Sequence, residues 1–174
     1  MKAIFNPFVI FSIILFCVCT SCHRKTVPAS SVTRGATSNT SRSNTHVDIK
    51  EMTSNILSYI NEHRRAIGLG NLQELDVAAA QAAKHSADMA AHRVAFGHSG
   101  FEARASAISK SLGSLSAAAE NVADGKLTAR QVVDGWLHSP GHKKNIEGNY
   151  SLTGIGVATD AGGVLYFTQI FVRK

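Results

Sequence analysis

The feature that most constrains the fold is the change in composition near residue 46. The segment HRKTVPASSVTRGATSNTSRSNTH, residues 23–46, is rich in Ser, Thr and Asn and has almost no apolar side chains. Such a segment cannot bury enough apolar surface to offset the entropy of ordering it, so we expect a disordered tether. Only residues 47–174 can therefore form a compact domain, and 128 residues is a usual size for one.

Residues 1–22, before this tether, have the pattern of a signal peptide. Lys2 precedes an apolar run, Phe8 to Cys19, that only Ser12 interrupts. The run is shorter than the roughly 20 apolar residues that span a bilayer, so we expect export rather than a transmembrane helix. The run leads into Cys-Thr-Ser-Cys, which resembles a bacterial lipobox, and we predict lipidation at Cys22. The alternative is ordinary signal cleavage nearby.

The cysteines and the charges also separate the leader from the domain. All three cysteines (Cys17, Cys19 and Cys22) lie in the leader, so the domain forms no internal disulfide and depends on its apolar core. Residues 1–46 contain 5 Lys or Arg and no acid, whereas residues 47–174 contain 13 against 12 Asp or Glu. The net charge of +6 therefore falls to +1 in the domain, and we expect no nucleic-acid partner.

Within the domain, the apolar periodicity predicts helices first and strands last. Asp48 and Glu51 have capping-box spacing, and Gly68 or Gly70 can end the helix that follows. Further helices are expected over 75–93, 101–112 and 128–138, and strands over 118–124, 152–160 and 163–174. The last two strands read as an antiparallel hairpin. This order predicts an α+β fold with a small antiparallel sheet between helical layers.

The stretch GWLHSPGHKKNI contains two histidines, His138 and His142, at the four-residue spacing of a zinc pair. Pro140 disfavours helical geometry at Ser139, so one helix ends there. Ser139 can then cap a short new helix that begins at Pro140 and holds His142 in its first turn. His138 points about 200° away from Trp136 and its buried face. We therefore expect the two histidines to act separately.

Other candidate groups are a loop histidine and a carboxylate among apolar neighbours. His98 follows the second helix, in Gly-His-Ser-Gly, where the glycine spacing around Ser99 does not match a nucleophile elbow. No H-E-x-x-H motif is present. His85 and His92 are two helical turns apart, too far for one metal, and are read as packing or surface residues. Glu120 either faces solvent at a strand end or is a buried acid that needs partners.

Seven motifs in one order resemble a known family. They are ILSYINEHRRAIGLGNL, AAKHSADMA, GHSG, AENVA, VVDGWLHSPGHKKNI, TGIGVA and YFTQIF. Together they resemble bacterial members of the CAP superfamily, which share the SCP domain of cysteine-rich secretory proteins, antigen 5 and plant pathogenesis-related proteins. The resemblance covers essentially all of residues 50–172. It implies a three-layer α-β-α sandwich with a central cavity.

The resemblance also implies a set of cavity residues. In eukaryotic members, two His and two Glu line the cavity. His98 matches the first His and Glu120 the Glu of the GEN motif, whereas the positions of the other Glu and His fall near Ser139 and on Tyr166. Bacterial relatives have the SPGH histidine instead. We therefore expect His142 to supply the second imidazole, with Tyr166 and Gln169 as polar lining.

Three functions fit this set. The first is an envelope or extracellular binding module, anchored through Cys22 or secreted if Cys22 is not lipidated, whose partner is a small molecule, a lipid or an envelope component. The second is a metal-assisted hydrolase in which His98 and His142 hold Zn²⁺ or another divalent cation and Glu120 activates water. Catalytic zinc usually has three protein ligands, which weakens this reading. The third is an adhesive or structural surface role without a site. We expect a monomer.

Overall fold

The computed structural model describes residues 47–174, so the expected signal peptide, lipidated Cys22 and tether lie outside the described residues. The described chain forms five helices and four strands. In chain order they are α1 (Ile49–Ala66), β1 (Gln73–Glu74), α2 (Asp76–Ala90), α3 (Phe101–Leu112), β2 (Ala117–Gly125), α4 (Ala129–His138), α5 (Pro140–Ile146), β3 (Leu152–Thr159) and β4 (Leu165–Arg173). No helix in this part of the chain has the length and apolar character that crossing a membrane requires.

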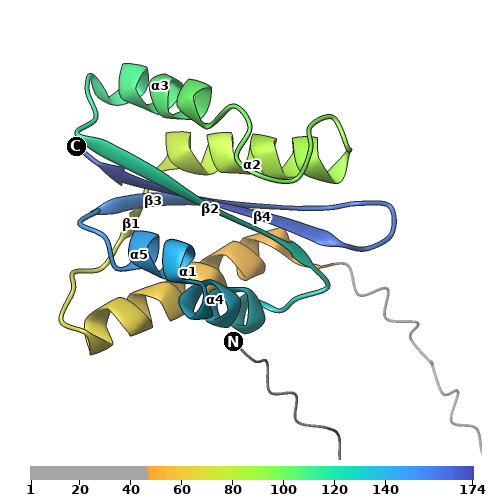
Figure 1. Cartoon of the computed structure of the whole chain (residues 1–174), viewed down its shortest axis with the longest axis horizontal. Helices are drawn as coiled ribbons and strands as arrows, with labels where there is room; N and C mark the ends of the chain where they lie inside the picture. Colours follow the sequence, from red (N-terminus) through yellow and green to blue (C-terminus); the bar gives the residue numbers. More distant parts are fainter. Residues whose placement is uncertain (1–46) are drawn as a thin grey trace, which may run out of the picture. The chain divides into compact units, whose positions relative to one another are not determined.

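The four strands form one sheet in the order β1-β3-β4-β2. Helices α2 and α3 cover one face of this sheet, and α1, α4 and α5 cover the other (Figure 1). The predicted α+β class and α-β-α layering are therefore confirmed. β2, β3 and β4 pair antiparallel as predicted, but β1 pairs parallel with β3. The sequence analysis missed β1, because its two residues are exposed and carry no apolar alternation.

Helix α1 begins and ends where its capping residues predict. The Asp48 carboxylate accepts the N–H of Glu51 at 3.0 Å. Gly68 has a φ of +80°, and the following N–H of Leu69 donates to the carbonyl of Arg64 at 2.8 Å. This is the Schellman arrangement, in which a left-handed glycine satisfies the last carbonyls of a helix.

Helix α2 ends at Ala90, three residues before the predicted end. His92 takes the left-handed conformation, with a φ of +52°, and the N–H of Arg93 turns back to the carbonyl of Asp88 at 2.9 Å. The prediction was wrong here because a histidine occupies the position that glycine usually marks.

Small residues allow α2 to lie directly on β3. A Cβ atom built on Gly154 would lie 2.0 Å from the backbone nitrogen of Ala79, and one on Gly156 would lie 2.1 Å from that of Ala83. The alanine-rich sequence of α2 therefore allows close approach to the sheet, and the sheet supplies the matching glycines.

The Ser-Pro break divides α4 from α5 as predicted. Thr128 and Gln131 form a complete capping box at the start of α4. Ser139 is extended, with φ −97° and ψ 117°, and Pro140 is the first residue of α5. The Ser139 side chain makes no capping hydrogen bond. Ser139 caps α5 only through its backbone carbonyl, which accepts the N–H of Lys143 at 2.8 Å. His138 is exposed, whereas Trp136 is 2% exposed.

The main core lies between the sheet and the α1–α4 layer. Its largest members alternate along β4 and repeat at helical spacing along α1 and α4. They are Ile56, Ile60, Val132, Val133, Trp136, Phe167 and Phe171. A smaller cluster on the other face joins α2, α3 and β4 through Ala78, Ala82, Ile108, Ile170 and Val172. The sheet is thus buried on both faces, and β2 forms one of its edges.

Candidate functional site

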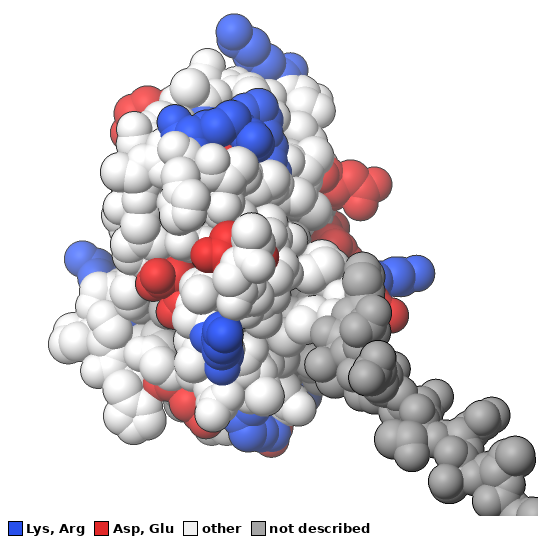
Figure 2. All heavy atoms as spheres, turned by 90° about the vertical axis from the view of Figure 1, so that its right-hand side faces the viewer, with Lys and Arg blue, Asp and Glu red and all other residues white. Residues whose placement is uncertain are grey.

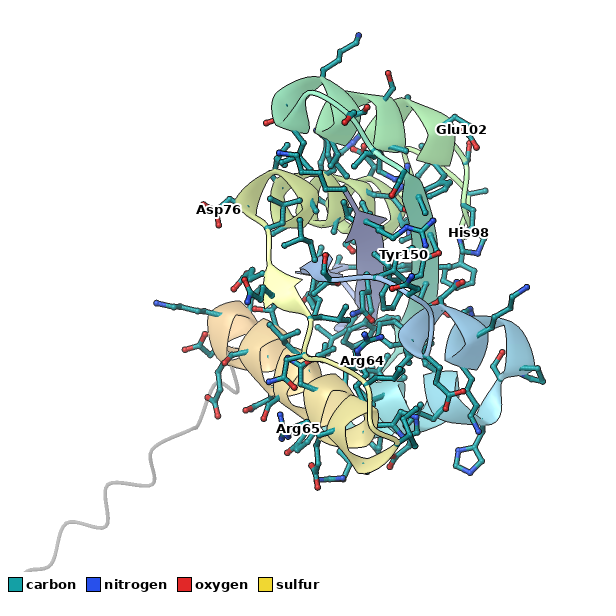
Figure 3. All side chains as sticks on the ribbon, turned by 90° about the vertical axis from the view of Figure 1, so that its left-hand side faces the viewer. Arg64, Arg65, Asp76, His98, Glu102 and Tyr150 are labelled. Carbon is teal, nitrogen blue, oxygen red and sulfur yellow. The ribbon has the colours of Figure 1, made fainter. Side chains whose placement is uncertain are left out.

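The loop between α2 and α3 carries His98 to the edge of the sheet. The buried His85 of α2 donates from Nε2 to the carbonyl of Gly97 at 2.8 Å, which fixes the loop next to His98. The expectation that His85 is a packing residue agrees with its 3% exposure. The side chain of His98 remains 53% exposed. Figure 3 shows His98 beside α3, with its side chain pointing toward α5.

Glu120 is a buried acid with partners. The sequence had also allowed a solvent-facing acid at a strand end, and the structure excludes that alternative. Its side chain is 1% exposed. Arg104 of α3 binds it through two parallel hydrogen bonds of 2.8 Å, from Nε to Oε2 and from Nη2 to Oε1. Arg104 also donates from Nη1 to the carbonyl of Ser99 at 2.8 Å. One guanidinium therefore neutralises the buried carboxylate and holds the loop that carries His98.

His98 lies within hydrogen-bond distance of the same carboxylate. The distance from its Nδ1 to Oε1 of Glu120 is 3.0 Å. Because a carboxylate accepts hydrogen bonds, this contact favours the tautomer with the proton on Nδ1. The lone pair on Nε2 of His98 is then available to a ligand.

Helix α5 approaches β2 from the other face of the sheet through asparagine side chains. Asn145 donates to the carbonyl of Glu120 at 3.2 Å and to the side chain of Asn121 at 2.9 Å. Asn121 in turn donates to the carbonyl of His142 at 3.2 Å. Trp136 of α4 donates to the carbonyl of Val122, also at 3.2 Å. These bonds satisfy outward carbonyls of an edge strand and place the first turn of α5 beside it.

His142 lies close enough to His98 for their charges to interact. Burial lowers the pKa of His142 below its ordinary value of 6.5, and the nearby imidazole of His98 lowers it further. His142 is therefore neutral at neutral pH and can donate from one ring nitrogen and accept at the other. The structure thus brings together three of the expected residues, His98, Glu120 and His142, at the β2 edge.

The other two expected residues lie on opposite faces of the sheet. Tyr166 and Gln169 are three residues apart on β4, and side chains alternate between the faces of a strand. Tyr166 packs against the end of α2, and its ring meets that of His92 edge-on at 6.4 Å. Gln169 is fully buried and donates to the hydroxyl of Thr153 at 3.1 Å. The structure does not bring Gln169 to the face on which His98 contacts Glu120.

The donor set can be compared with the needs of a zinc centre. Among residues 47–174, no group of three or more His, Cys, Asp or Glu side chains lies close enough together to hold a metal ion. A catalytic zinc site needs three protein ligands, and both oxygens of Glu120 already bind Arg104. These residues therefore do not fit a catalytic zinc centre, and we derive no step through a metal.

Arg104, the residue that organises the site, was not among the residues expected from the sequence. One signal could have found it. Arg104 is four residues before Ile108, on the buried stripe of α3, and a charged side chain on a buried stripe requires a buried partner. Glu120 was the obvious candidate for that partner. Asn121 and Asn145 carried no comparable signal, because amides are common on exposed surfaces.

Comparison with known proteins gives one family. Residues 57–171 match the sequence profile of the cysteine-rich secretory protein family, abbreviated CAP. The uncharacterized protein YkwD of Bacillus subtilis (strain 168) is 44% identical over 66 residues, which are 37% of this chain and 25% of that protein. This chain therefore spans about a quarter of the length of its curated relative.

Solved structures with the same fold come from other bacteria. An extracellular SCP-domain protein of Bacillus anthracis (strain Ames) is 26% identical, with a TM-score of 0.62 over 72% of this chain and 41% of that one. An outer surface protein of Borrelia burgdorferi is 23% identical, with a TM-score of 0.61 over 72% of this chain and 94% of that one. The second likeness concerns the fold alone.

Proposed function

The chain belongs to the CAP family of cysteine-rich secretory proteins, and we propose that it is an exported binding module that takes a polar component of the cell envelope at the His98–His142 edge. The single observation that carries this proposal is the state of Glu120. Its two oxygens bind Arg104, and one of them also contacts His98. The carboxylate therefore orients an imidazole instead of activating water.

The same observation weighs against the hydrolase alternative. A general base must be within reach of the proton that it abstracts, and its basicity must suit the working pH. Glu120 is buried beneath His98, and both of its carboxylate oxygens already accept hydrogen bonds from Arg104. His98 and His142 would then have to perform the chemistry without Glu120 as the general base, so we favour binding.

The exposed groups of the edge suit an uncharged polar ligand such as a glycan. The neutral imidazole of His142 and the Nε2 atom of His98 offer a donor and an acceptor side by side. Phe96, two residues before His98, is 51% exposed and adds an apolar surface. Sites of this kind commonly combine a few placed polar groups with an aromatic contact.

The location of the protein is part of the proposal. We propose export through the leader and anchoring through lipidated Cys22, with the Ser/Thr-rich tether between membrane and domain. The tether has 24 residues, so as a random coil its reach is roughly 27 Å. The extracellular nature of the Bacillus anthracis relative supports export.

Binding to isolated peptidoglycan sacculi tests the function directly. Wild-type protein, His98→Gln and His142→Gln are mixed with sacculi and sedimented, and the supernatant is assayed for released fragments. We expect the wild type to co-sediment, and both variants to bind several-fold less, because each loses the imidazole ring that places its hydrogen-bonding atoms. We expect no fragments to be released. His138→Gln is the matched control, since His138 is an exposed histidine on the neighbouring helix.

The outcomes separate the three functions. Release of fragments that requires His98 and His142 would favour the hydrolase. Equal binding by the wild type and both site variants would show that this edge is not the binding site. Absence of binding by all proteins would contradict an envelope glycan as the partner.

The lipid anchor has its own test. Cys22→Ala should move the protein from the membrane fraction to the soluble fraction of cells, because the acyl chains are lost. Cys19→Ala is the matched control in the same leader and should remain in the membrane fraction. Unchanged partitioning of Cys22→Ala would contradict lipidation.

A further inference from the structure

Arg64 is buried without a carboxylate partner among residues 47–174. The residue is 3% exposed, yet its guanidinium binds only backbone carbonyls, with donor–acceptor distances of 2.6–3.1 Å. The acceptors are the carbonyls of Gly70, Ile146, Gly148 and Tyr150. Burial lowers the pKa of Arg64, which reflects the cost of keeping this charge out of water. A positive charge therefore lies beneath the loop from α5 to β3 without an internal counter-charge.

The loop above Arg64 directs a backbone N–H away from it. In a trans peptide the C=O and the next N–H point in opposite directions. The carbonyl of Gly148 points to Arg64 at 3.0 Å, so the N–H of Asn149 points to the other side of the loop. Within the described residues this N–H makes no hydrogen bond to the protein. Figure 3 views this side of the molecule, with Arg64 below the loop that carries Tyr150.

A groove of about 600 Å³ lies on this loop, lined by Gly148, Asn149 and Tyr150. Three cations from two elements also line it, namely Lys143 and Lys144 of α5 and Arg173 of β4. Neither Lys144 nor Arg173 has a carboxylate within 4.0 Å in the part of the chain that the structure describes. Arg173 is held in place by a hydrogen bond from its Nε to the hydroxyl of Ser116 at 3.0 Å.

Two features oppose an anion in this groove, and both are offset. Glu147 is the carboxylate of the groove, but His63 binds it at 2.8 Å and Lys143 lies 3.8 Å from it. The C-terminal carbonyls of a helix also repel an anion. Here Arg64 binds the carbonyl of Ile146, the last residue of α5. The charge balance of the groove is therefore positive, although the whole domain has a net charge of only +1.

The side of the molecule opposite the groove carries charges of both signs. On the face in Figure 2, which lies on the opposite side from the view of Figure 3, basic and acidic side chains are interspersed. Positive side chains gathered around a backbone N–H are the usual recognition elements for phosphate groups.

We propose that the groove between α5 and the end of β4 is a binding site for a phosphate group, held by Lys144, Arg173 and the N–H of Asn149, with Arg64 supplying positive charge from below. The site is distinct from the His98–His142 edge, because neither histidine lines this groove. Its ligand is a phosphate-bearing envelope component, either a lipid headgroup or a polymer phosphate.

Titration with inorganic phosphate at constant ionic strength tests the site. The protein as exported is followed by amide NMR, and we expect a saturable shift of the Asn149 N–H. Lys144→Gln combined with Arg173→Gln should weaken binding by at least about fivefold, because two exposed charge contacts are lost. The matched control combines Lys126→Gln with Arg130→Gln, which removes the same charges from a different groove and should leave the affinity unchanged.

The outcomes either support or overturn the site. A non-saturable shift, or equal affinity in the wild type and the Lys144/Arg173 double variant, would overturn it. Vesicles identify the source of the phosphate. Binding to phosphatidylglycerol but not phosphatidylcholine vesicles, weakened in the same double variant, supports a lipid headgroup. Phosphate binding without vesicle binding supports a polymer phosphate.

Discussion

Arg64 and Arg104 are both buried arginines, but their partners differ. Arg104 binds the carboxylate of Glu120, so its charge is neutralised within the domain. Arg64 binds only carbonyls, so its charge is not. The two regions therefore differ mainly in whether the buried guanidinium has a buried carboxylate to neutralise it. Near Arg104 the protein presents the imidazoles of His98 and His142, whereas above Arg64 it presents a positive groove.

The largest effect is expected from Arg64→Met. This change removes four hydrogen bonds to carbonyls and should lower the free energy of unfolding by about 3–4 kcal/mol, at roughly 1 kcal/mol for each lost bond. Chemical denaturation measures this. Arg65→Met is the matched control, because Arg65 is the exposed neighbour on the same helix (Figure 3) and should cost less than about 0.5 kcal/mol. A loss below about 1 kcal/mol for Arg64→Met would mean that water replaces the guanidinium.

Arg104→Met should cost somewhat less, about 2–3 kcal/mol, because the Glu120 carboxylate keeps its contact with His98. A double-mutant cycle with Glu120→Gln sharpens the contrast with Arg64. We expect Glu120→Gln to recover part of the unfolding free energy that Arg104→Met loses, since it removes the buried carboxylate that Arg104→Met leaves without its arginine. Glu102→Gln, at an exposed position on the same helix, should recover nothing. Additive losses from Arg104→Met and Glu120→Gln would contradict a coupled pair.

Acid should destabilise the His98–His142 region through His142. Because its folded-state pKa lies below the ordinary value of 6.5, the unfolded chain binds more protons in this range. Stability should therefore fall as the pH decreases from 7 through the lowered pKa, and be unaffected by His142 above pH 7. The His142→Gln variant should show a shallower fall in unfolding free energy over this range, whereas exposed His138→Gln should follow the wild type. An unchanged slope in His142→Gln would contradict the lowered pKa.

Much of the fold was predictable because it depends on local signals. The caps at Asp48 and Thr128, and the Ser139-Pro140 break, are each encoded within a few residues. The end of α2 was not predictable, because His92 takes a conformation that its residue type does not indicate. Strand β1 depends on a parallel pairing with the distant β3, which no local pattern records.

The site was predictable only in part because it depends on contacts between distant elements. The structure brings His98 to Glu120, as the resemblance implied, but the pairing of Glu120 with Arg104 had to be observed. The expectation that Tyr166 and Gln169 line the same cavity conflicted with the alternation of side chains along a strand. Tyr166 and Gln169 are separated by an odd number of residues on one strand, so a period of two already assigns them to opposite faces.

The smallest predicted effect concerns the contact between the two imidazoles. His98→Gln removes the lesser of the two causes that lower the pKa of His142, while burial, the larger cause, stays. The pKa of His142 should therefore rise, yet stay below 6.5, in an NMR titration of its ring protons. His138→Gln should leave it unchanged. If His98→Gln also leaves it unchanged, the two rings do not interact, and the edge near Arg104 would hold two separate histidines instead of one site.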